Sequence, residues 1–442
     1  MTQASIKEAI LNRRMLICVF TGFTSGLPLY VVIQLIPAWL RVEGVGLAEI
    51  GFFTLIGLPY TWKFLWSPVM DRYTLPFLGR RRGWMFLTQV SLMLVIAAMG
   101  FFKPAMSIWT IASLATLLAF LSASQDIVLD AYRRELLPDA ELGLGNSIHV
   151  QGYRLAGLVP GSLALILADF LPWHTVFMIV ASFMSVGVIL TLFIHEAVSE
   201  PKPPETLVEA VVEPFLEFFS RKGVSAALLI LAFMFLYKLG DSMATALSSA
   251  FYLDVGFSLT AIGTIAKFAS LTAAIVGGLV GGVIMIKLGI NRALWLFGVV
   301  QVVSIFGFAL LSEFAFLTQT AILQKSAFPN FVTLLYETGA DPHMLWVLGI
   351  VVAFEYLGVG LGTAAFIAFI ARTTNPTFAA TQFALFTALT ALPRTLFNSS
   401  TGVIVEKIGY TSFFIFCVAL AIPGMLLLLK VAPWNERSAT DS

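Results

Sequence analysis

The sequence predicts an all-α integral membrane protein with about 12 transmembrane helices, arranged as two six-helix bundles. The first observation is composition: 59% of the 442 residues are hydrophobic and 12% are charged, with a mean hydropathy of +0.92. Soluble domains carry about 25% charged residues, so a soluble chain of this composition has too few polar side chains to cover its surface. The second observation is the length of the apolar runs, and the third is the distribution of basic residues between loops.

The apolar runs are long enough to cross a bilayer, which takes roughly 20 residues in a helix. Helices are expected because lipid cannot hydrogen-bond an exposed backbone. The first run follows a polar start and lacks a cleavage-type ending, so it is interpreted as a span and not as a signal peptide. The predicted spans are residues 15–40, 50–69, 84–102, 107–130, 144–171, 175–194, 225–251, 259–286, 294–311, 344–371, 379–405 and 411–429.

Basic residues distinguish the two sides of the predicted bundle. With the N-terminus inside, about 17 lysines and arginines fall in the inner segments and about four in the outer segments. Inner loops of membrane proteins carry such an excess, so both termini are expected in the cytoplasm.

The predicted organisation is two bundles, at residues 1–195 and 224–430, with a cytoplasmic linker at 196–223 and a cytoplasmic tail at 431–442. The linker has the apolar spacing of an amphipathic helix on the membrane surface, and a flexible loop is the alternative. Residues 313–342 form a long outer insertion whose apolar pieces are too short to cross. Glycine-rich basic loops after the second and eighth spans give the halves a weak internal repeat, which is typical of two-bundle transporters.

Motifs for catalysis and nucleotide binding are not found in the sequence. It has no nucleotide-binding loop, no metal-ligand spacing and no Ser/His/Asp set, so neither an enzyme nor a self-contained primary pump is expected. Cys18 and Cys417 lie in apolar runs and are interpreted as core residues. The net charge of +1 gives no argument for a nucleic-acid partner. No cofactor, metal or obligate protein partner is expected.

Ionisable residues inside the predicted spans are the most informative feature of the sequence. Such residues are costly in a membrane and are functional by default. The deep cations are Lys63, Arg154, Lys238, Lys267 and Arg394, and the deep anions are Asp126, Asp241 and Glu355. The surplus of positive charge suits an anionic substrate, and carboxylates that can take protons suit coupling to a proton gradient.

Two acidic residues of the fourth span, Asp126 and Asp130, are four positions apart and share one helical face. Asp130 lies near the cytoplasmic end beside Arg133 and Arg134 and is expected to form a structural ion pair, with the Asp71–Arg72 loop as a suggested partner. Asp126 lies deeper, and Arg154 on the adjacent fifth span is its expected cation. That pair is either a static salt bridge or a pair that opens when a proton or a substrate arrives.

The second half contains the predicted proton-coupling residue. Lys238 and Asp241 are three positions apart on one face of the seventh span, so they are placed to pair with each other. Glu355 stands in the middle of the tenth span without a cation at a neighbouring helical position. We therefore expect Glu355, with Asp126 and Asp241, to be the candidates for proton binding.

The predicted binding site combines these charges with amide and aromatic side chains. Tyrosine rings can stack on sugar rings, although aromatic residues are also common in membrane cores. The predicted substrate-binding residues are Tyr60, Lys63, Gln125, Asp126, Gln151, Tyr153, Arg154, Tyr237, Lys238, Lys267 and Arg394. The predicted gating residues, around the inner loop after the second span, are Asp71, Arg72, Arg80, Arg81, Arg82 and Arg133.

Several motifs resemble the AmpG-type permeases of the major facilitator superfamily. The longest is KFLWSPVMDRYTLPFLGRRRGW at 63–84, a variant of the superfamily's loop after the second span. The others are FTGFTSGLPL at 20–29, SASQDIVLDA at 122–131, GYRL at 152–155, YKLGD at 237–241 and TQFAL at 381–385. Together they extend the resemblance from about residue 15 to about residue 430.

The resemblance implies a major facilitator fold with alternating access. It also implies proton-driven import of anhydro-muropeptides, which are GlcNAc-anhydroMurNAc with or without a peptide, across the bacterial inner membrane. Such import serves peptidoglycan recycling and, through its cargo, β-lactam resistance. Related families carry acetyl-CoA, so a transporter of another organic anion is an alternative. A membrane sensor that binds its ligand without moving it is a second alternative.

Overall fold

The computed structural model describes residues 12–196, 216–325, 342–374, 386, 391 and 395–435, and every regular element among them is a helix. The predicted all-α class is therefore confirmed. Most of the linker at 196–223 and most of the tail at 431–442 lie outside the described residues, although 216–222 at the end of the linker are helical.

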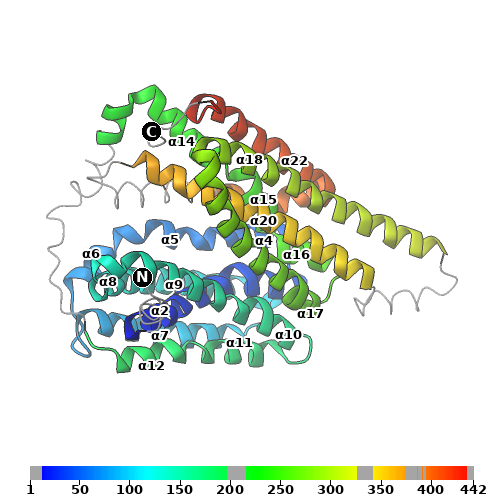
Figure 1. Cartoon of the computed structure of the whole chain (residues 1–442). Coiled ribbons are helices and arrows are strands. Elements are labelled where there is room, and N and C mark those ends of the chain that lie inside the picture. Colours follow the sequence, from blue (N-terminus) through cyan, green and yellow to red (C-terminus); the bar gives the residue numbers. More distant parts are fainter. Residues whose placement is uncertain are drawn as a thin grey trace. The chain divides into compact units, whose positions relative to one another are not determined.

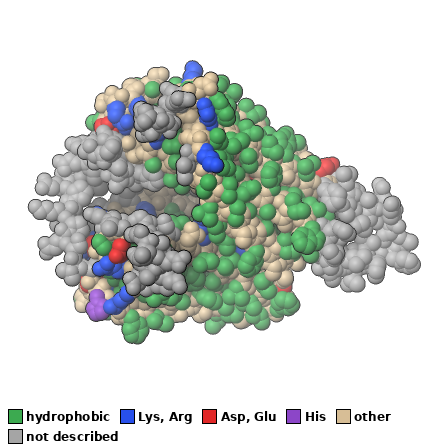
Figure 2. Space-filling view, in the orientation of Figure 1, with side chains coloured by type: hydrophobic (Ala, Val, Ile, Leu, Met, Phe, Trp, Pro, Cys, Tyr) green, Lys and Arg blue, Asp and Glu red, His purple; other side chains and the backbone are tan. Residues whose placement is uncertain are grey.

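Ten helices of the described residues are long and apolar enough to cross a membrane. They coincide with ten of the predicted spans, and hydrophobic side chains cover much of the face shown in Figure 2. Their bounds are Arg13–Val42, Arg80–Met99, Met106–Leu136, Ile148–Ala168, Trp173–Phe193, Val224–Asp254, Leu259–Met285, Lys287–Glu313, Met344–Thr373 and Thr401–Val431. The eleventh predicted span, 379–405, lies mostly outside the described residues.

The second predicted span, 50–69, is a broken helix and not the single helix that its composition suggests. It consists of α4 (Leu47–Phe52), a 3₁₀ turn (Phe53–Gly57), α5 (Leu58–Trp62), a second 3₁₀ turn (Lys63–Leu65) and α6 (Ser67–Arg72). Pro59 and Pro68 occupy the first turns of α5 and α6. A proline lacks the backbone N–H that would continue the preceding helix, so each one favours a new start.

The chain forms two compact units. Unit 1 is Met1–Val45 with Leu55–Pro203, and unit 2 is Gly46–Thr54 with Pro204–Ser442. The short segment Gly46–Thr54, which contains α4, therefore belongs by its contacts to the unit formed by the second half of the chain.

Unit 1 contains the helices of the first half of the sequence except α4 (Figure 1). In addition to α5 and α6, they are α2 (Arg13–Tyr30), the π-helix η1 (Val31–Leu35), α3 (Ile36–Val42), α7 (Arg80–Met99), α8 (Pro104–Leu136), α9 (Asp139–Ala156), the π-helix η4 (Val159–Leu163), α10 (Ala164–Ala168), α11 (Trp173–Ser182) and α12 (Ser185–Phe193).

Helices α2 and α9 pack with their backbones in contact. A Cβ atom added at Gly22 would collide with the carbonyl oxygen of His149, and one at Gly26 would collide with that of Tyr153. From the other side, a Cβ at Gly152 would collide with the carbonyl oxygen of Val19. Small residues four apart allow this approach in membranes, and here they bring Tyr153 against the first span.

Unit 2 contains the helices of the second half. In addition to α4, they are α14 (Val224–Leu236), α15 (Leu239–Ala246), α16 (Ser248–Asp254), α17 (Leu259–Ala261), the π-helix η5 (Ile262–Ala266), α18 (Lys267–Lys325), α20 (Pro342–Thr373) and α22 (Thr401–Val431). Gly289, with φ of +74°, turns the chain between the two spans of α18. The helix continues to Lys325, so the first part of the insertion predicted at 313–342 is helical.

Small residues also set the distance between α18 and α20. A Cβ at Gly277 would lie 2.6 Å from the carbonyl oxygen of Leu357, and one at Gly360 would lie 2.5 Å from that of Ala274. These two glycine-rich helices therefore pack with their backbones in close contact.

Helix α4 packs on α22 within unit 2. Gly402 leaves no room for a side chain beside the carbonyl oxygen of Leu47. Glu406 Oε1 accepts a hydrogen bond from the backbone N–H of Ala48 at 2.9 Å. This carboxylate satisfies one of the free N–H groups in the first turn of α4, where the helix dipole favours negative charge.

Candidate functional site

Polar side chains from four spans of unit 1 meet around Asp126, which lies on α8 and is partly buried. Ser25 on α2 donates a hydrogen bond to Asp126 Oδ1 at 2.5 Å. Tyr60 and Tyr153 adjoin the same carboxylate. Lys63 is the cation that acts most strongly on it. We call these five residues, Ser25, Tyr60, Lys63, Asp126 and Tyr153, the Asp126 cluster.

Lys63 is the cation of this cluster that remains available to a ligand. Its Nζ atom lies 3.8 Å from Asp130 Oδ2, and its side chain is 35% exposed. Asp130 has a closer partner, because Arg133 Nη2 lies 2.8 Å from its Oδ1. A separation of 3.8 Å is an ion pair without a hydrogen bond, so the ammonium keeps donors for a bound anion.

The predicted pairing of Asp126 with Arg154 is wrong. Arg154 lies beside Tyr30, whose ring packs on that of Tyr153 with centroids 5.6 Å apart. Lys63 takes the position beside Asp126 because the broken second span brings the 3₁₀ turn that contains Lys63 against α8. Asp130 forms the expected structural ion pair, and its partner is Arg133; the side chains of the suggested Asp71–Arg72 loop lie outside the described part.

The two glutamines predicted for the substrate site have different surroundings. Gln125 is fully buried, and its Nε2 atom donates to the carbonyl oxygen of Thr24 at 2.9 Å. Gln125 therefore joins α8 to α2. Gln151 is exposed on α9.

Three of the predicted gating arginines, Arg80, Arg81 and Arg82, form the first turn of α7, whereas Arg133 lies on α8. Glu196 Oε1 accepts from the backbone N–H of Arg81 at 2.6 Å, and Oε2 accepts from that of Arg82 at 3.2 Å. Three arginines in the first turn of a helix oppose its dipole, and this carboxylate offsets the effect. The side chain of Arg82 donates to the carbonyl oxygens of Thr191 and Leu192, each at 3.0 Å. The side chains of Asp71 and Arg72 lie outside the described part.

Glu135 on α8 is buried and pairs with two of these arginines. Its Oε1 atom lies 2.8 Å from Arg81 Nη2 and 2.9 Å from Arg80 Nη2. The side chains of Glu135 and Arg81 are only 3% and 5% exposed. The pair therefore compensates two buried charges inside unit 1.

Glu135→Gln is expected to lower the free energy of unfolding of the protein by about 3–5 kcal/mol, because it removes the buried carboxylate that pairs with the Arg81 guanidinium. Thermal unfolding in detergent measures the loss. Glu141→Gln is the control, because Glu141 pairs with a half-exposed Arg14 at 3.2 Å and should cost less than about 1 kcal/mol. Equal losses in the two variants would contradict this assignment.

Lys238 and Asp241 form the ion pair predicted from their spacing. Lys238 Nζ lies 2.8 Å from Asp241 Oδ2, and the two side chains are 11% and 8% exposed. The pair lies where the seventh span breaks: Lys238, with φ of −105° and ψ of −1°, separates α14 from α15. Asp241 is in the first turn of α15, where the helix dipole favours its negative charge. Broken helices with charges at the break are typical of ligand and ion sites in transporters.

Glu355 on α20 is fully buried. Within the described residues, neither of its carboxyl oxygens has a hydrogen-bond partner of good geometry. Asp241 and Ser304 adjoin it, and Lys238, which also acts on it, is already paired with Asp241. An unpaired carboxylate is costly in such surroundings, whereas a protonated carboxyl is not. The geometry therefore suits a carboxyl group that carries a proton.

The remaining predicted residues of the second half are less closely grouped. Tyr237 belongs to the core of unit 2: its ring stacks on Phe366 with centroids 5.8 Å apart, and its hydroxyl donates to the carbonyl oxygen of Leu294 at 3.0 Å. Lys267 is buried at the start of α18. Arg394 lies outside the described residues.

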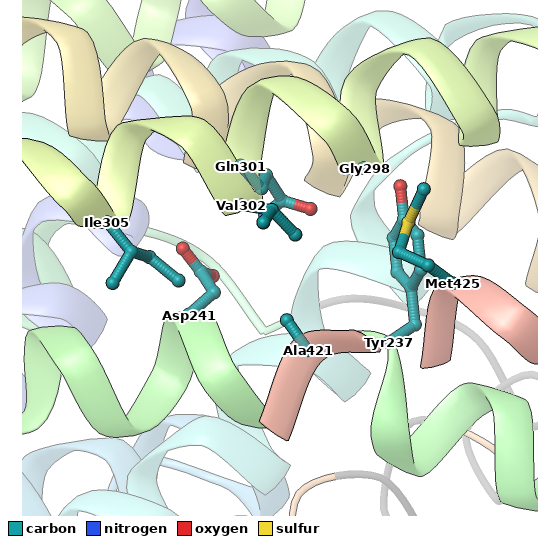
Figure 3. Close-up of a pocket in the computed structure, with 8 residues that line it drawn as sticks. All are labelled: Tyr237, Asp241, Gly298, Gln301, Val302, Ile305, Ala421 and Met425. Carbon is teal, nitrogen blue, oxygen red and sulfur yellow. The ribbon is translucent and has the colours of Figure 1, made fainter. Parts of the chain in front are cut away.

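Two polar residues of α18 that were not predicted complete the group around Glu355. Gln301 and Ser304 are 4% and 0% exposed. Figure 3 shows the Gln301 amide and the Asp241 carboxylate directed into one small pocket. The signal in the sequence is a polar residue in an otherwise apolar span. A prediction based on charged residues does not include Gln301, because its side chain is neutral.

The comparisons with known proteins agree with a transporter. Residues 18–343 match the Major Facilitator Superfamily. The structure of the nucleoside transporter NupG aligns with a TM-score of 0.65 at 13% identity, covering 97% of this chain and 100% of that one. A POT family transporter in complex with 5-aminolevulinic acid aligns with a TM-score of 0.66 at 14% identity, covering 96% and 97%. The protein is thus a multi-pass membrane transporter of the major facilitator superfamily and not an enzyme.

Closer relatives identify the family. The anhydromuropeptide permease of Escherichia coli K12 is 43% identical over 418 residues, which are 94% of this chain and 79% of the permease. An uncharacterized protein of Haemophilus influenzae is 49% identical over 443 residues, which are 99% of each chain. The chain belongs to the AmpG family of anhydromuropeptide permeases.

Proposed function

We propose that the protein imports anhydro-muropeptides across the bacterial inner membrane by proton symport with alternating access, for peptidoglycan recycling. The observation that carries the proposal is the Asp126 cluster, in a chain 43% identical to an anhydromuropeptide permease. The cluster offers an accessible ammonium, a carboxylate and two phenol groups in unit 1. These groups match the carboxylates, hydroxyls and amides of a glycopeptide.

The proton is assigned to Glu355. Its carboxyl group is buried beside the Lys238–Asp241 pair, and it has no cation of its own among the described residues. A site of this kind gains a proton more readily than it holds a bare charge. Release of that proton on the cytoplasmic side would complete each cycle of import.

The orientation follows from the distribution of basic residues, which places both termini in the cytoplasm. With this orientation, the Arg80–Arg82 region and its carboxylate partners Glu135 and Glu196 face the cytoplasm. We assign that region to gating, because its contacts tie α7 to α8 and to the end of α12. Import of its cargo would also supply the signal that induces β-lactamase, which connects the protein to β-lactam resistance.

Uptake of labelled anhydro-muropeptide into proteoliposomes, with and without an inward proton gradient, tests the proposal. Accumulation that depends on the gradient would support both the cargo and the coupling. Binding without accumulation would favour a sensor. Uptake of acetyl-CoA but not of the muropeptide would favour a transporter of another organic anion.

Lys63→Met is expected to raise the KM for anhydro-muropeptide by about tenfold or more, because a hydrogen bond to a charged group is lost. Lys63→Arg keeps the charge and should change the KM less. Lys103→Met, at an exposed position of unit 1, is the matched control. The assignment of Lys63 fails if the KM of Lys63→Met equals that of the Lys103→Met protein.

A further inference from the structure

A small internal cavity of unit 2 lies between α15, α18 and α22. Its volume is about 10 Å³, which is the space that one water molecule requires. Asp241, Gln301 and Tyr237 line its polar side, and Val302 and Ala421 are among its apolar residues. In Figure 3 the Asp241 carboxylate and the Gln301 amide both point into this space.

The polar groups that line the cavity have unused hydrogen-bonding capacity. Asp241 Oδ1 and both amide atoms of Gln301 are buried without a hydrogen-bond partner among the described residues. Both side chains are more than nine-tenths buried. Buried polar groups in native proteins are almost always paired with protein or with ordered water. One water can donate to Asp241 Oδ1 and accept from Gln301 Nε2, which satisfies two of these three atoms.

The packing of α20 against α18 keeps Gln301 in this position. Glu355, Gly358 and Gly362 lie on one face of α20 at helical spacing. A Cβ at Gly362 would collide with the Gln301 amide, and one at Gly358 would lie 2.9 Å from Ser304 Oγ. Because this face of α20 has glycines at 358 and 362, it leaves room for the Gln301 and Ser304 side chains beside Glu355. Gln301 and Glu355 consequently both adjoin Asp241, Gln301 across the cavity and Glu355 directly.

We propose that this cavity binds one water molecule and that Gln301 is the positioning residue that holds it against Asp241. The water stabilises the Asp241 carboxylate by donating a hydrogen bond to Oδ1, while Lys238 binds Oδ2. Asp241 therefore stays ionised, and the exchangeable proton stays on the neighbouring Glu355. The inference rests on the proposed proton coupling. In it, Gln301 and the water together set the pH at which the proton is released.

The sign of the expected effect follows from the charge. Loss of the water makes the Asp241 carboxylate less stable, so Asp241 takes a share of the proton from Glu355. Because the proton can then lie on either carboxyl group, the pair keeps it to a higher pH. Among the described residues, the charged and titratable groups that face this pair are Lys238 and Tyr237 at the α14–α15 junction, Tyr252 on α16 and Cys417 on α22, and none of them is changed by the variants below. Ser304 and Tyr252 also adjoin Glu355.

The test is an infrared titration of the protonated carboxyl absorption in the purified full chain, with the band of Glu355 assigned by its loss in Glu355→Gln. Gln301→Met removes the amide but keeps the length of the side chain. Val302→Ile keeps the amide and adds one methyl group, about the size of a water, to the cavity wall. Both are expected to weaken the Glu355 band in favour of a second protonated-carboxyl band, that of Asp241, and to raise the midpoint pH at which the pair loses its proton, since one hydrogen bond to the Asp241 carboxylate is lost. Gln301→Asn keeps an amide on a shorter side chain, so its midpoint should lie between that of the wild-type protein and that of Gln301→Met.

Gln89→Met is the matched control, because Gln89 is a buried glutamine of unit 1 that accepts from Thr191 at 2.8 Å. It should leave the midpoint unchanged. A shift in Gln301→Met without one in Val302→Ile would overturn the role of the water, and no shift in either would overturn the whole inference. The titration needs no substrate. A shifted midpoint in a protein that does not import anhydro-muropeptide would therefore reject the cargo and keep the site.

Discussion

Glu355→Gln is expected to abolish the accumulation of substrate against its gradient while exchange of substrate across the membrane continues. Glutamine has the shape of a protonated glutamate but cannot release a proton. Glu355 is fully buried, so the amide occupies the same space without introducing a charge. The variant should therefore fold and bind substrate, but it should carry no proton with it.

The size of the effect follows from the energy of the gradient. One proton that crosses with a gradient of one pH unit supplies about 1.4 kcal/mol, which supports about tenfold accumulation. For Glu355→Gln the ratio of internal to external substrate should fall to about one, as expected for transport without coupling. The measurement is uptake of labelled anhydro-muropeptide into proteoliposomes, compared with counterflow in the same vesicles without a gradient.

Two variants control this experiment. Glu355→Asp keeps a carboxyl group and should keep part of the accumulation. Glu406→Gln changes an acidic residue of unit 2 that caps α4, and it should keep the coupling. Proton-driven accumulation by Glu355→Gln at the wild-type level would show that another carboxylate, Asp126 or Asp241, carries the proton.

Lys238→Met is expected to destabilise the protein by about 3–5 kcal/mol, because it leaves the Asp241 carboxylate buried without its cation. The two side chains are 11% and 8% exposed, and they lie where the helix of the seventh span is broken. Thermal unfolding in detergent should show the loss, and transport should fall with it. Asp241 can also become neutral by taking a proton. Asp241 and Glu355 would then both be protonated.

The double variant Lys238→Met with Asp241→Asn separates these effects. It removes both charges, so it should recover much of the stability lost in Lys238→Met. Proton-driven accumulation should remain impaired, because the electrostatic partners of Glu355 are gone. If Lys238→Met alone is as stable as the wild-type protein, the ion pair does not contribute to the fold.

The helical type and the approximate place of ten spans were predictable because apolar length is a local property of the sequence. The windows for these ten helices overlap those of the structure, and their ends differ by up to ten residues. The geometry of the second span was not predictable from hydropathy. Its 3₁₀ turns around Gly57 and Lys63 do not change the mean apolarity of the window.

The site was predictable where partners are close in sequence. Lys238 and Asp241 are three residues apart, so helical spacing alone predicted their pair. The partners of Asp126 come from other spans, and the rotation of one helix against another is set by packing that the sequence does not display. The same reason explains why Glu135 and Glu196 were missed: each finds its arginines only after α7, α8 and α12 have packed.

The position of α4 has a consequence for experiments that divide the chain. α4 precedes the linker by about 150 residues, but its contacts lie on α22, through Gly402 and Glu406. A cut in the linker would therefore leave neither fragment with a complete set of packing partners: the second would lack a helix, and the first would carry one that packs on nothing of its own. For fragment complementation, residues 46–54 should therefore be moved to the second fragment, so that α4 stays with α22.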